Sequence, residues 1–348
     1  MKIVIMAAGT GGHIFPGIAV AKELMQLNVE VLWLGAVGGM EEKIVSDHKI
    51  PLKLLAIKGL RGKGIKGLIT MPFKLITATL TARKYFKQEK VDAVLSMGGY
   101  VAGPGGLAAK LKGIPLVVHE QNSKFGLTNR YLSKWAKKVL TGFNLNGLYH
   151  SSWIGNPVRE TIEKVKKVEK PHELIHVLIV GGSLGAQSLN TQLPEILKPL
   201  LENKHIMVRH QSGKNKQKNT HENYGEVTNV LVHEFIDDMA EAYYWADFII
   251  ARAGALTVAE INAVGLPSIL IPYPYAVDDH QTSNAQSIVD NQAGFIWQES
   301  EEVESLSTAV NKLVNDKVLR KHMAENSKKL HKPHAARKVA ENCLEVVA

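Results

Sequence analysis

A histidine stands inside the first glycine-rich stretch of the chain. A strand-like run begins at Lys2. It is followed by the stretch GTGGH, which occupies residues 9–13 and has His13 as its last residue. A stretch that only binds phosphate needs backbone N–H groups and small residues, and it needs no imidazole. An imidazole has an ordinary pKa near ~6.5 and can accept a proton at neutral pH. His13 is therefore a candidate base, and a helix-capping or purely positioning role is the alternative.

A second glycine-rich stretch, GGSLGA, occupies residues 181–186. Both stretches lie between a strand-like and a helix-like segment, where backbone N–H groups and the helix dipole favour phosphate. Neither has the G-x-G-x-x-G spacing of a dinucleotide-binding loop, since Ile14 stands at the sixth position of the first. The alternative is that these glycines only permit tight turns.

A third candidate site follows the strand-like run FIIA. A helix is expected to begin near Ala255, with Glu260 in its second turn. The helix N-terminus favours phosphate, and the carboxylate can accept hydrogen bonds from both hydroxyls of a ribose. An ordinary acid on a helix surface is the alternative for Glu260. Further on, DDHQTSNA (278–285) gathers polar side chains that suit sugar hydroxyls or a helix cap.

Metal chemistry finds little support in the sequence. No H-E-x-x-H and no Asp-x-Asp motif occurs, and His331 and His334 flank Pro333 in a segment expected to be solvated. Cys343 is the only cysteine, so no intrachain disulfide can form. We expect no metal and no cofactor.

Strand-like and helix-like segments alternate along the 348 residues, a length that suits about two domains. Expected strands occupy residues 2–8, 30–36, 52–57, 92–98, 115–120, 138–143, 176–180, 206–211, 230–235, 247–252, 268–274 and 293–297. Their apolar composition predicts parallel sheets covered by helices on both faces. We therefore expect two doubly wound α/β domains in tandem with a cleft between them, joined by the polar stretch 161–173.

Positive charge is concentrated in the first half of the chain. The net charge is +9, yet residues 1–156 hold 21 Lys and Arg against 8 Asp and Glu, and no acid occurs between Asp47 and Glu89. This asymmetry predicts an anionic partner. Apolar residues interleave with the cations over 57–87, which favours a membrane surface over a nucleic acid. A buried amphipathic helix with a solvated basic face is the alternative.

Seven motifs together resemble one family. In chain order they are GTGGHIFPG, SMGGYVAGPGG, HEQN, GNPVR, GGSLGA, RAGALTVAE and DDHQTSNA. Their order and spacing are similar to those of the MurG family of bacterial peptidoglycan glycosyltransferases, over nearly the whole chain.

The resemblance implies a GT-B fold of two Rossmann-like domains, residues 1–157 and 158–332, with a C-terminal helix (about 333–348) returning to the first. It implies inverting transfer of N-acetylglucosamine from UDP-GlcNAc to the 4-hydroxyl of undecaprenyl-pyrophosphoryl-MurNAc-pentapeptide (lipid I), which gives lipid II. It also implies a peripheral location on the cytoplasmic face of the bacterial inner membrane, with no nucleic acid partner.

By similarity, UDP-GlcNAc is expected to contact a set of residues from both domains: Thr10, Gly11, Gly12, Asn122, Arg159, Ser183, Ile236, Ala255, Leu256, Thr257, Val258, Ala259, Glu260 and Gln281. Two positions depart from the family, because Leu184 replaces a common Gln and Ala253 a common Ser. A backbone contact survives both changes.

An inverting displacement needs one base and stabilisation of the departing diphosphate. His13 is the expected base. Backbone N–H groups of 181–185 and the helix start at Ala255 would face the diphosphate, with Arg159 as a charge partner.

The residues expected to face the membrane are Arg61, Lys63, Lys66, Leu68, Ile69, Phe73 and Lys74. Two other functions remain open. One is another enzyme on the same fold, such as a UDP-GlcNAc 2-epimerase or a glycolipid synthase. The other is a non-catalytic, membrane-associated protein that binds a nucleotide sugar.

Overall fold

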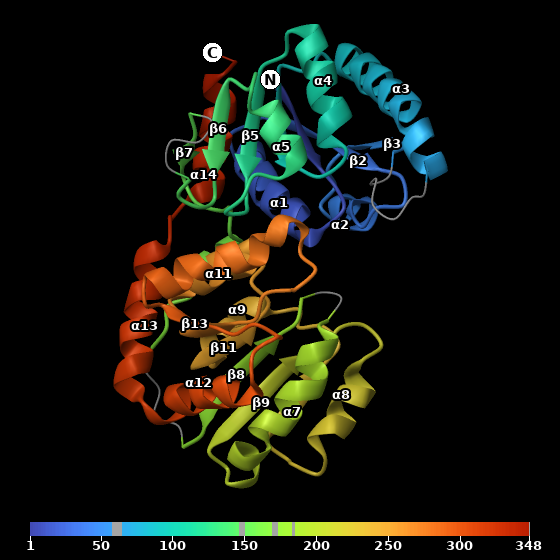
Figure 1. The fold of residues 1–348 in the computed structure, drawn as a ribbon. Coiled ribbons are helices and arrows are strands. Elements are labelled where there is room, and N and C mark those ends of the chain that lie inside the picture. The colour runs from blue at the N-terminus through green and yellow to red at the C-terminus, as the bar shows by residue number, and fades with distance from the viewer. Residues whose placement is uncertain (58–64, 146–149, 169–172, 183–184, 348) are drawn as a thin grey trace. The chain divides into compact units, whose positions relative to one another are not determined.

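The computed structural model describes residues 1–57, 65–145, 150–168, 173–182 and 185–347, with the backbone alone at 65–69 and 277. The chain forms two compact units (Figure 1). Unit 1 comprises Met1–Arg159 and His334–Ala348, and unit 2 comprises Glu160–Pro333. The sequence placed this division two residues earlier, at 157/158.

Unit 1 contains a seven-stranded sheet in the order β3-β2-β1-β4-β5-β6-β7, and every pair is parallel. Its strands are β1 Lys2–Ala7, β2 Glu30–Ala36, β3 Leu52–Leu55, β4 Ala93–Gly98, β5 Leu116–Glu120, β6 Lys138–Thr141 and β7 Ser152–Trp153. Its helices are α1 Gly11–Gln26, α2 Glu41–Asp47, α3 Ile65–Glu89, α4 Ala102–Lys112, α5 Leu127–Leu132 and α14 Ala335–Glu345.

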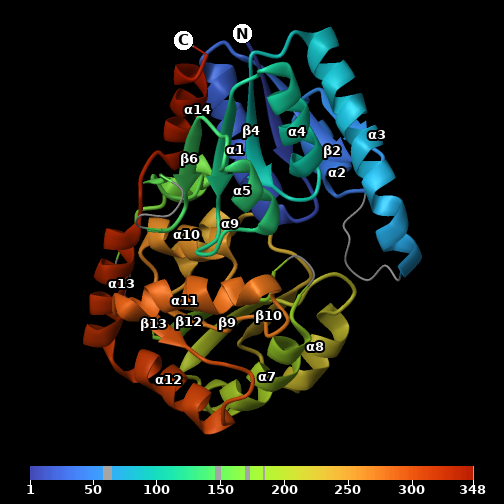
Figure 2. The ribbon, with the colours of Figure 1, turned by 45° about the horizontal axis from the view of Figure 1, so that its top comes forward.

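Alternation along β1 divides the core of unit 1 into two layers. Ile3 and Ile5 pack with α1 and α14, whereas Val4 and Met6 pack with α3 and α4. This is the period-2 pattern of a strand buried on both faces. Figure 2 shows α3 running beside α4 on one side of the sheet. Helix α1 approaches β2 so closely that a Cβ on Gly17 would lie 2.6 Å from the ring of Trp33.

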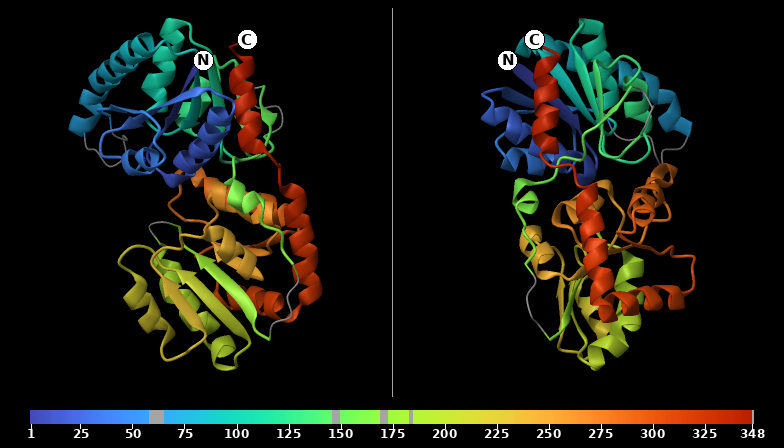
Figure 3. Two further views of the ribbon diagram at one scale, coloured as in Figure 1. Left: turned by 180° about the vertical axis from the view of Figure 1, so that it is seen from behind. Right: turned by 90° about the vertical axis from the view of Figure 1, so that its left-hand side faces the viewer.

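The C-terminal helix is part of the core of unit 1. Val339, Ala340 and Cys343 of α14 are fully buried and belong to the same cluster as apolar residues of α1. Figure 3 shows α14, the red C-terminal helix, in unit 1 beside α1. Pro333 lies in the break between α13, which ends at Leu330, and α14, as the sequence predicted.

Unit 2 repeats the arrangement with a six-stranded parallel sheet in the order β10-β9-β8-β11-β12-β13. Its strands are β8 Ile175–Val180, β9 Ile206–Gln211, β10 Val230–His233, β11 Phe248–Ala251, β12 Ser268–Leu270 and β13 Gly294–Ile296. Its helices are α6 Glu160–Glu163, α7 Gln187–Glu202, α8 Gln217–Tyr224, α9 Met239–Trp245, α10 Ala255–Val264, the 3₁₀ turn η1 Val277–Asp279, α11 His280–Asp290, α12 Val303–Asn315 and α13 Lys317–Leu330.

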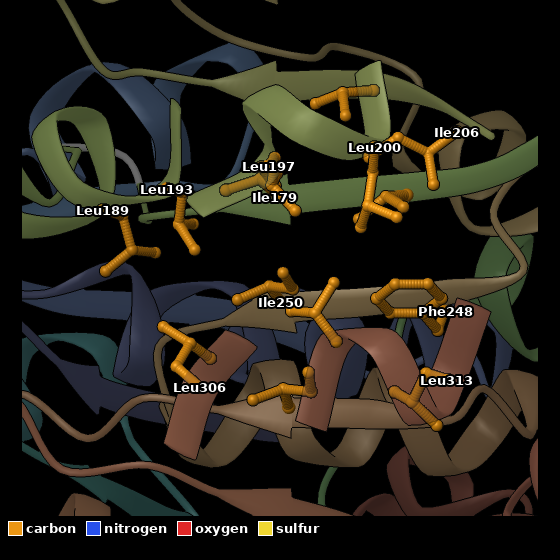
Figure 4. Close-up of a cluster of buried hydrophobic side chains, with 14 of the residues drawn as sticks. Ile179, Leu189, Leu193, Leu197, Leu200, Ile206, Phe248, Ile250, Leu306 and Leu313 are labelled. Carbon is orange, nitrogen blue, oxygen red and sulfur yellow. The ribbon is translucent and has the colours of Figure 1, made fainter. Parts of the chain in front are cut away.

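Both faces of this sheet are covered. Figure 4 shows leucines of α7 and α12 pointing toward Ile179 and Ile250 of the sheet, in one cluster of buried side chains. On the opposite face, Leu178 and Ile249 are fully buried as well. The doubly wound α/β prediction is confirmed for each unit, and all twelve expected strands form. The two-residue β7 is an additional strand.

Candidate active site

Both glycine-rich stretches lie where the strand order of a sheet reverses. In unit 1, β1 lies between β2 and β4, and the first stretch joins β1 to α1. In unit 2, β8 lies between β9 and β11, and the second stretch joins β8 to α7. Ligands of open α/β sheets bind outside the carboxyl ends of the strands at such reversal points. Each unit therefore presents one candidate binding loop.

In unit 1 the helix begins earlier than the sequence predicted, and His13 belongs to it. The helix-like run GIAVAKELMQL of the sequence starts at Gly17, but α1 starts at Gly11, so His13 is its third residue. Glycines have low helix propensity, which concealed this first turn in the sequence. Among the described residues, no acceptor bonds the N–H of Gly11 or Gly12. Those two N–H groups are open to an anion.

The position of Gly9 is fixed by a buried carboxylate. Glu41 is fully buried, and its two oxygens accept hydrogen bonds from the N–H groups of Gly9 (3.3 Å) and Ala36 (2.9 Å). Gly9 itself has φ +94°, which favours glycine. Thr10 follows as the exposed N-cap of α1.

The ring of His13 contacts the end of β5 and caps no helix. Its Nδ1 lies 2.8 Å from Oε1 of Gln121, and Thr10 occupies the N-cap. The helix-capping alternative is therefore wrong, and the roles of base and of positioning residue remain. The ring is only half-buried.

Two polar side chains at the end of β5, His119 and Gln121, have different partners. His119 is fully buried, and its Nε2 lies 3.0 Å from the carbonyl of Gly155. Burial lowers the pKa of His119 to about 4, against the weaker opposing effect of that hydrogen bond, so its imidazole is neutral at pH 7. Gln121 bridges His119 and His13.

Glu120 anchors the loop that carries Asn122. Its carboxylate accepts four hydrogen bonds: two from Asn122 through its backbone N–H and Nδ2, one from the N–H of Gly126, and one from Nδ2 of Asn129. Asn122 is half-buried beside this carboxylate. The buried carboxylate of Glu120 is thus satisfied by neutral donors, as buried polar groups require.

Arg159 is the last residue of unit 1 before the division. Its guanidinium lies 6.0 Å from the centre of the Phe15 ring, on α1. Arg159 therefore lies near the first turns of α1, within the same unit as His13.

In unit 2 the glycine loop is held by the end of β9. Gly185 has φ +68°, and a Cβ there would lie 1.9 Å from the carbonyl oxygen of Ser212. Gln211 is buried and donates through Nε2 to the carbonyl of Gly182 (3.1 Å). Ser183 and Leu184 lie outside the described residues.

Gln211 also fixes Ile236. Its Oε1 accepts a hydrogen bond from the N–H of Ile236 (3.1 Å), so one amide links the glycine loop to the segment after β10. Because this N–H is occupied, Ile236 can offer a ligand its carbonyl or its side chain.

Helix α10 begins at Ala255, as the sequence predicted. The side chains of Ala255, Val258 and Glu260 are buried, whereas those of Leu256, Thr257 and Ala259 are half-exposed. Val258 can therefore contact a ligand only through its backbone. Leu256, Thr257 and Ala259 are the residues of this segment whose side chains can contact a ligand.

Glu260 is not a surface acid. It is 5% exposed, and its Oε2 accepts a hydrogen bond from the hydroxyl of Tyr243 (2.9 Å). The alternative from the sequence is thus wrong, because α10 packs against neighbouring helices on nearly all sides.

The segment after β11 is braced by Arg252, whose role no sequence pattern indicates. This guanidinium donates to the carbonyls of Ile271 and Pro272, to Ser188 Oγ (2.9 Å), and pairs with Glu299 (2.5 Å). It joins the ends of β11 and β12 to the start of α7.

Two polar side chains of α11, Asn284 and Gln281, differ in their hydrogen-bond partners and in their burial. Asn284 is buried and donates to the carbonyl of Ala253 (3.1 Å). Gln281 is half-buried, and its Oε1 accepts from the N–H of Tyr273 (2.9 Å). No acceptor among the described residues bonds Nε2 of Gln281, which remains available to a ligand.

Gln121 and Gln211 were both missed, although one signal could have found them. Gln121 follows β5, which is separated from β1 by β4 alone, and Gln211 ends β9, which is next to β8. Polar residues at the carboxyl ends of such strands are expected to lie at the ligand-binding edge.

Of the residues expected to face a membrane, Arg61 and Lys63 lie outside the described residues, as do the side chains of Lys66, Leu68 and Ile69. Phe73 and Lys74 are exposed on α3. No helix in the described part of the chain is both long and apolar enough to cross a bilayer. Within the same residues, no three potential ligands among His, Cys, Asp and Glu gather as a metal site.

Comparison with known proteins gives the family. Residues 3–141 match the glycosyltransferase family 28 N-terminal domain, and residues 176–339 match the corresponding C-terminal domain. A protein of Alkalilimnicola ehrlichii is 45% identical over 352 residues, 99% of each chain. It is named UDP-N-acetylglucosamine--N-acetylmuramyl-(pentapeptide) pyrophosphoryl-undecaprenol N-acetylglucosamine transferase.

Solved structures agree. MurG of Acinetobacter baumannii has a TM-score of 0.85 and 40% identity, with 99% of each chain covered. A UDP-N-acetylglucosamine 2-epimerase has a TM-score of 0.70 at 13% identity, covering 99% of this chain and 95% of that one, which shows the fold alone. The chain therefore belongs to glycosyltransferase family 28 and, within it, to the MurG family, with the two Rossmann-like domains of the GT-B fold.

Proposed function

We propose that the protein transfers N-acetylglucosamine from UDP-GlcNAc to the 4-hydroxyl of the MurNAc unit of lipid I, which forms lipid II for peptidoglycan synthesis. The observation that carries this proposal is the similarity, over 99% of the chain, to relatives named for that transfer. The epimerase alternative has fold similarity alone in its favour.

His13 is proposed as the base. The reaction inverts the α-linkage of the donor in one displacement, so one group must accept the proton of the acceptor hydroxyl. His13 lies at the start of α1, where the strand order reverses, and its ring is half-buried with Nδ1 bonded. Its second nitrogen is the group that would accept the proton.

The donor is proposed to bind through unit 2, with contributions from Thr10, Gly11, Gly12, Asn122 and Arg159 of unit 1. In unit 2, the glycine loop and the N-terminus of α10 would face the diphosphate, and Glu260 would accept from the ribose. In support of this, Gln211 bonds the glycine loop, and Arg252, which precedes α10, bonds Ser188 at the start of α7. Helix N-termini can stabilise the departing diphosphate without a metal.

We also propose that α3 binds an anionic membrane surface, peripherally, on the cytoplasmic face of the inner membrane. Phe73, Ile76 and Leu80 are 73%, 57% and 53% exposed, and their spacing puts them on one side of the helix. The opposite side carries the buried residues Ala78 and Ala82.

Cations flank the exposed apolar side of α3. Arg83, Lys84 and Lys87 are exposed one to two turns beyond Leu80. The alternative, a buried amphipathic helix with a solvated basic face, does not account for the exposed apolar side chains of Phe73, Ile76 and Leu80. Apolar residues that enter the acyl boundary beside cations that meet anionic headgroups are typical of an interfacial helix.

The test is an assay of UDP release with UDP-GlcNAc and a short-chain polyprenyl-pyrophosphoryl MurNAc-pentapeptide, in the presence of EDTA. We expect acceptor-dependent UDP and a product heavier by one N-acetylhexosamine. His13→Ala is expected to lower kcat by roughly 10²–10⁴-fold. Donor binding without any release of UDP, also after metal is added back, would leave only a binding protein or a different acceptor.

A further inference from the structure

We propose that Gln121 fixes the tautomer of His13, placing the ring proton on Nδ1 and leaving the lone pair on Nε2. This inference rests on the proposed function of His13 as the base. It makes Gln121 a positioning residue, since it acts on the reaction through His13 alone.

The orientation of the Gln121 amide follows from its partners. Its Nε2 lies 2.9 Å from the carbonyl oxygen of His119, which can only accept a hydrogen bond. The NH₂ group must therefore stand on that side, and Oε1 faces His13 at 2.8 Å from Nδ1. An amide oxygen also only accepts, so His13 Nδ1 must carry the proton.

His119 enforces the same orientation independently. Its Nε2 lies 3.0 Å from the carbonyl of Gly155 and must carry a proton to bond it. Its Nδ1, at 3.0 Å from Nε2 of Gln121, is then the acceptor. Burial keeps this imidazole neutral at pH 7, so no second proton reaches Nδ1 to repel the amide.

Each hydrogen bond in this series has only one possible direction. The reason is that the backbone carbonyls of Gly155 and His119 can only accept hydrogen bonds. The series runs from Gly155 through His119 and Gln121 to His13. Reversing the His13 tautomer would point the lone pair of Nδ1 at the lone pairs of Gln121 Oε1 and lose the hydrogen bond between them.

The ring is also confined on a second side. Gly98, at the end of β4, has φ +102°, and a Cβ there would lie 3.1 Å from Cε1 and 3.2 Å from Nδ1 of His13. In the described part of the chain no hydrogen bond engages Nε2 of this ring. The free lone pair is therefore on the nitrogen that an acceptor hydroxyl can approach.

The experiment observes the tautomer directly. Long-range ¹H–¹⁵N correlation spectra of the full chain, labelled at the histidine nitrogens, distinguish Nδ1–H from Nε2–H, and the His13→Asn spectrum identifies the His13 signals. We expect Nδ1–H in the unsubstituted protein. Gln121→Met removes the acceptor at similar size, and we expect signals of the Nε2–H form to appear.

Kinetics provide the second readout. For Gln121→Met we expect kcat to fall at least about tenfold, since part of the base contribution is lost, while KM for UDP-GlcNAc stays within about twofold. Gln121→Glu restores an acceptor to Nδ1 and is expected to retain the Nδ1–H form. Gln217→Met is the matched control, because it removes one glutamine hydrogen bond, to the carbonyl of Val232, in unit 2.

The outcomes separate this inference from the proposed function. An Nε2–H signal for His13 in the unsubstituted protein overturns the inference even if transfer is observed. An unchanged tautomer and an unchanged kcat in Gln121→Met overturn it as well. Failure of the transfer assay, or full activity of His13→Ala, refutes the proposed reaction or base without altering the spectrum.

Discussion

The hydroxyl of Tyr243 donates a hydrogen bond of 2.9 Å to Oε2 of Glu260 and so joins α9 to α10. Both residues are buried, yet Glu260 is proposed to bind the ribose of the donor. The bond therefore connects the packing of two helices to the orientation of a proposed ligand-binding carboxylate.

We expect Tyr243→Phe to destabilise unit 2 by about 1.5–3 kcal/mol, because a buried carboxylate loses a donor. KM for UDP-GlcNAc should rise as Glu260 loses its fixed orientation. Chemical unfolding and initial-rate kinetics measure the two effects. Tyr275→Phe is the control for stability, since that side chain is 81% exposed. If Glu260→Gln binds the donor as tightly as the unsubstituted protein, the ribose contact is refuted.

Gly185→Ala should disrupt the second glycine loop. The added Cβ would lie 1.9 Å from the carbonyl oxygen of Ser212, a contact that only backbone movement can relieve. We expect donor affinity, measured by calorimetry, to fall more than about tenfold, since the loop N–H groups shift. Gly113→Ala is matched in φ (+68°) but has no neighbour within 4 Å, and it should cost only about 1–2 kcal/mol of stability with donor affinity unchanged. Equal effects of the two substitutions would contradict the steric argument.

Acid should destabilise both units through buried histidines. Burial lowers the pKa of His119 to about 4 and that of His210 to about 3, below the ordinary value near ~6.5. At a pH between these folded-state pKa values and the unfolded value, the unfolded chain binds more protons than the folded one. The free energy of unfolding is therefore highest above pH ~6.5 and falls as the pH decreases toward 4. Each histidine should contribute a loss on the order of 2 kcal/mol between pH 7 and 5.

Urea unfolding at the two pH values measures this loss. In the folded state, neutral His210 bonds Asn190 Oδ1 (3.1 Å) and the hydroxyl of Tyr224 (2.8 Å). His210→Gln removes the titrating group, and we expect the loss on acidification to shrink by about 2 kcal/mol. An unchanged pH dependence in this variant would show that His210 titrates normally.

Membrane binding should depend on two kinds of residue on α3. Replacing Phe73, Ile76 and Leu80 with Ser should abolish most co-sedimentation with anionic vesicles, because the buried apolar area is lost. Replacing Arg83, Lys84 and Lys87 with Gln should weaken binding by about 1 kcal/mol for each charge and reduce its dependence on salt. Val318→Ser on α13, where the side chain is 78% exposed, is the matched control. Equal vesicle binding by all variants would refute the membrane role of α3.

The fold was largely predictable from the sequence, whereas the site was predictable only in part. The strands are short apolar runs between helical segments, and that pattern suffices for two parallel sheets. The start of α1 was not predictable, because glycines occupy its first turn. Likewise, the hydrogen bond between His13 and Gln121 joins residues 108 positions apart, and no local pattern indicates it.

Burial explains the remaining differences. Glu260 and Glu41 look like surface acids in a helical pattern, yet each is buried against donors from distant segments. Whether a carboxylate in a helix faces solvent depends on how many helices surround it, which is a property of the tertiary fold.

The return of α14 to unit 1 determines the order in which the two units can be completed during synthesis. Residues 160–333 are continuous, so unit 2 has all its strands and helices before the chain ends. Unit 1 begins first, but until the segment 334–348 leaves the ribosome its core lacks Val339, Ala340 and Cys343. The apolar side of α1 remains exposed throughout that interval, and such surface favours misfolding and chaperone binding. The first unit to be translated is thus the last to be completed.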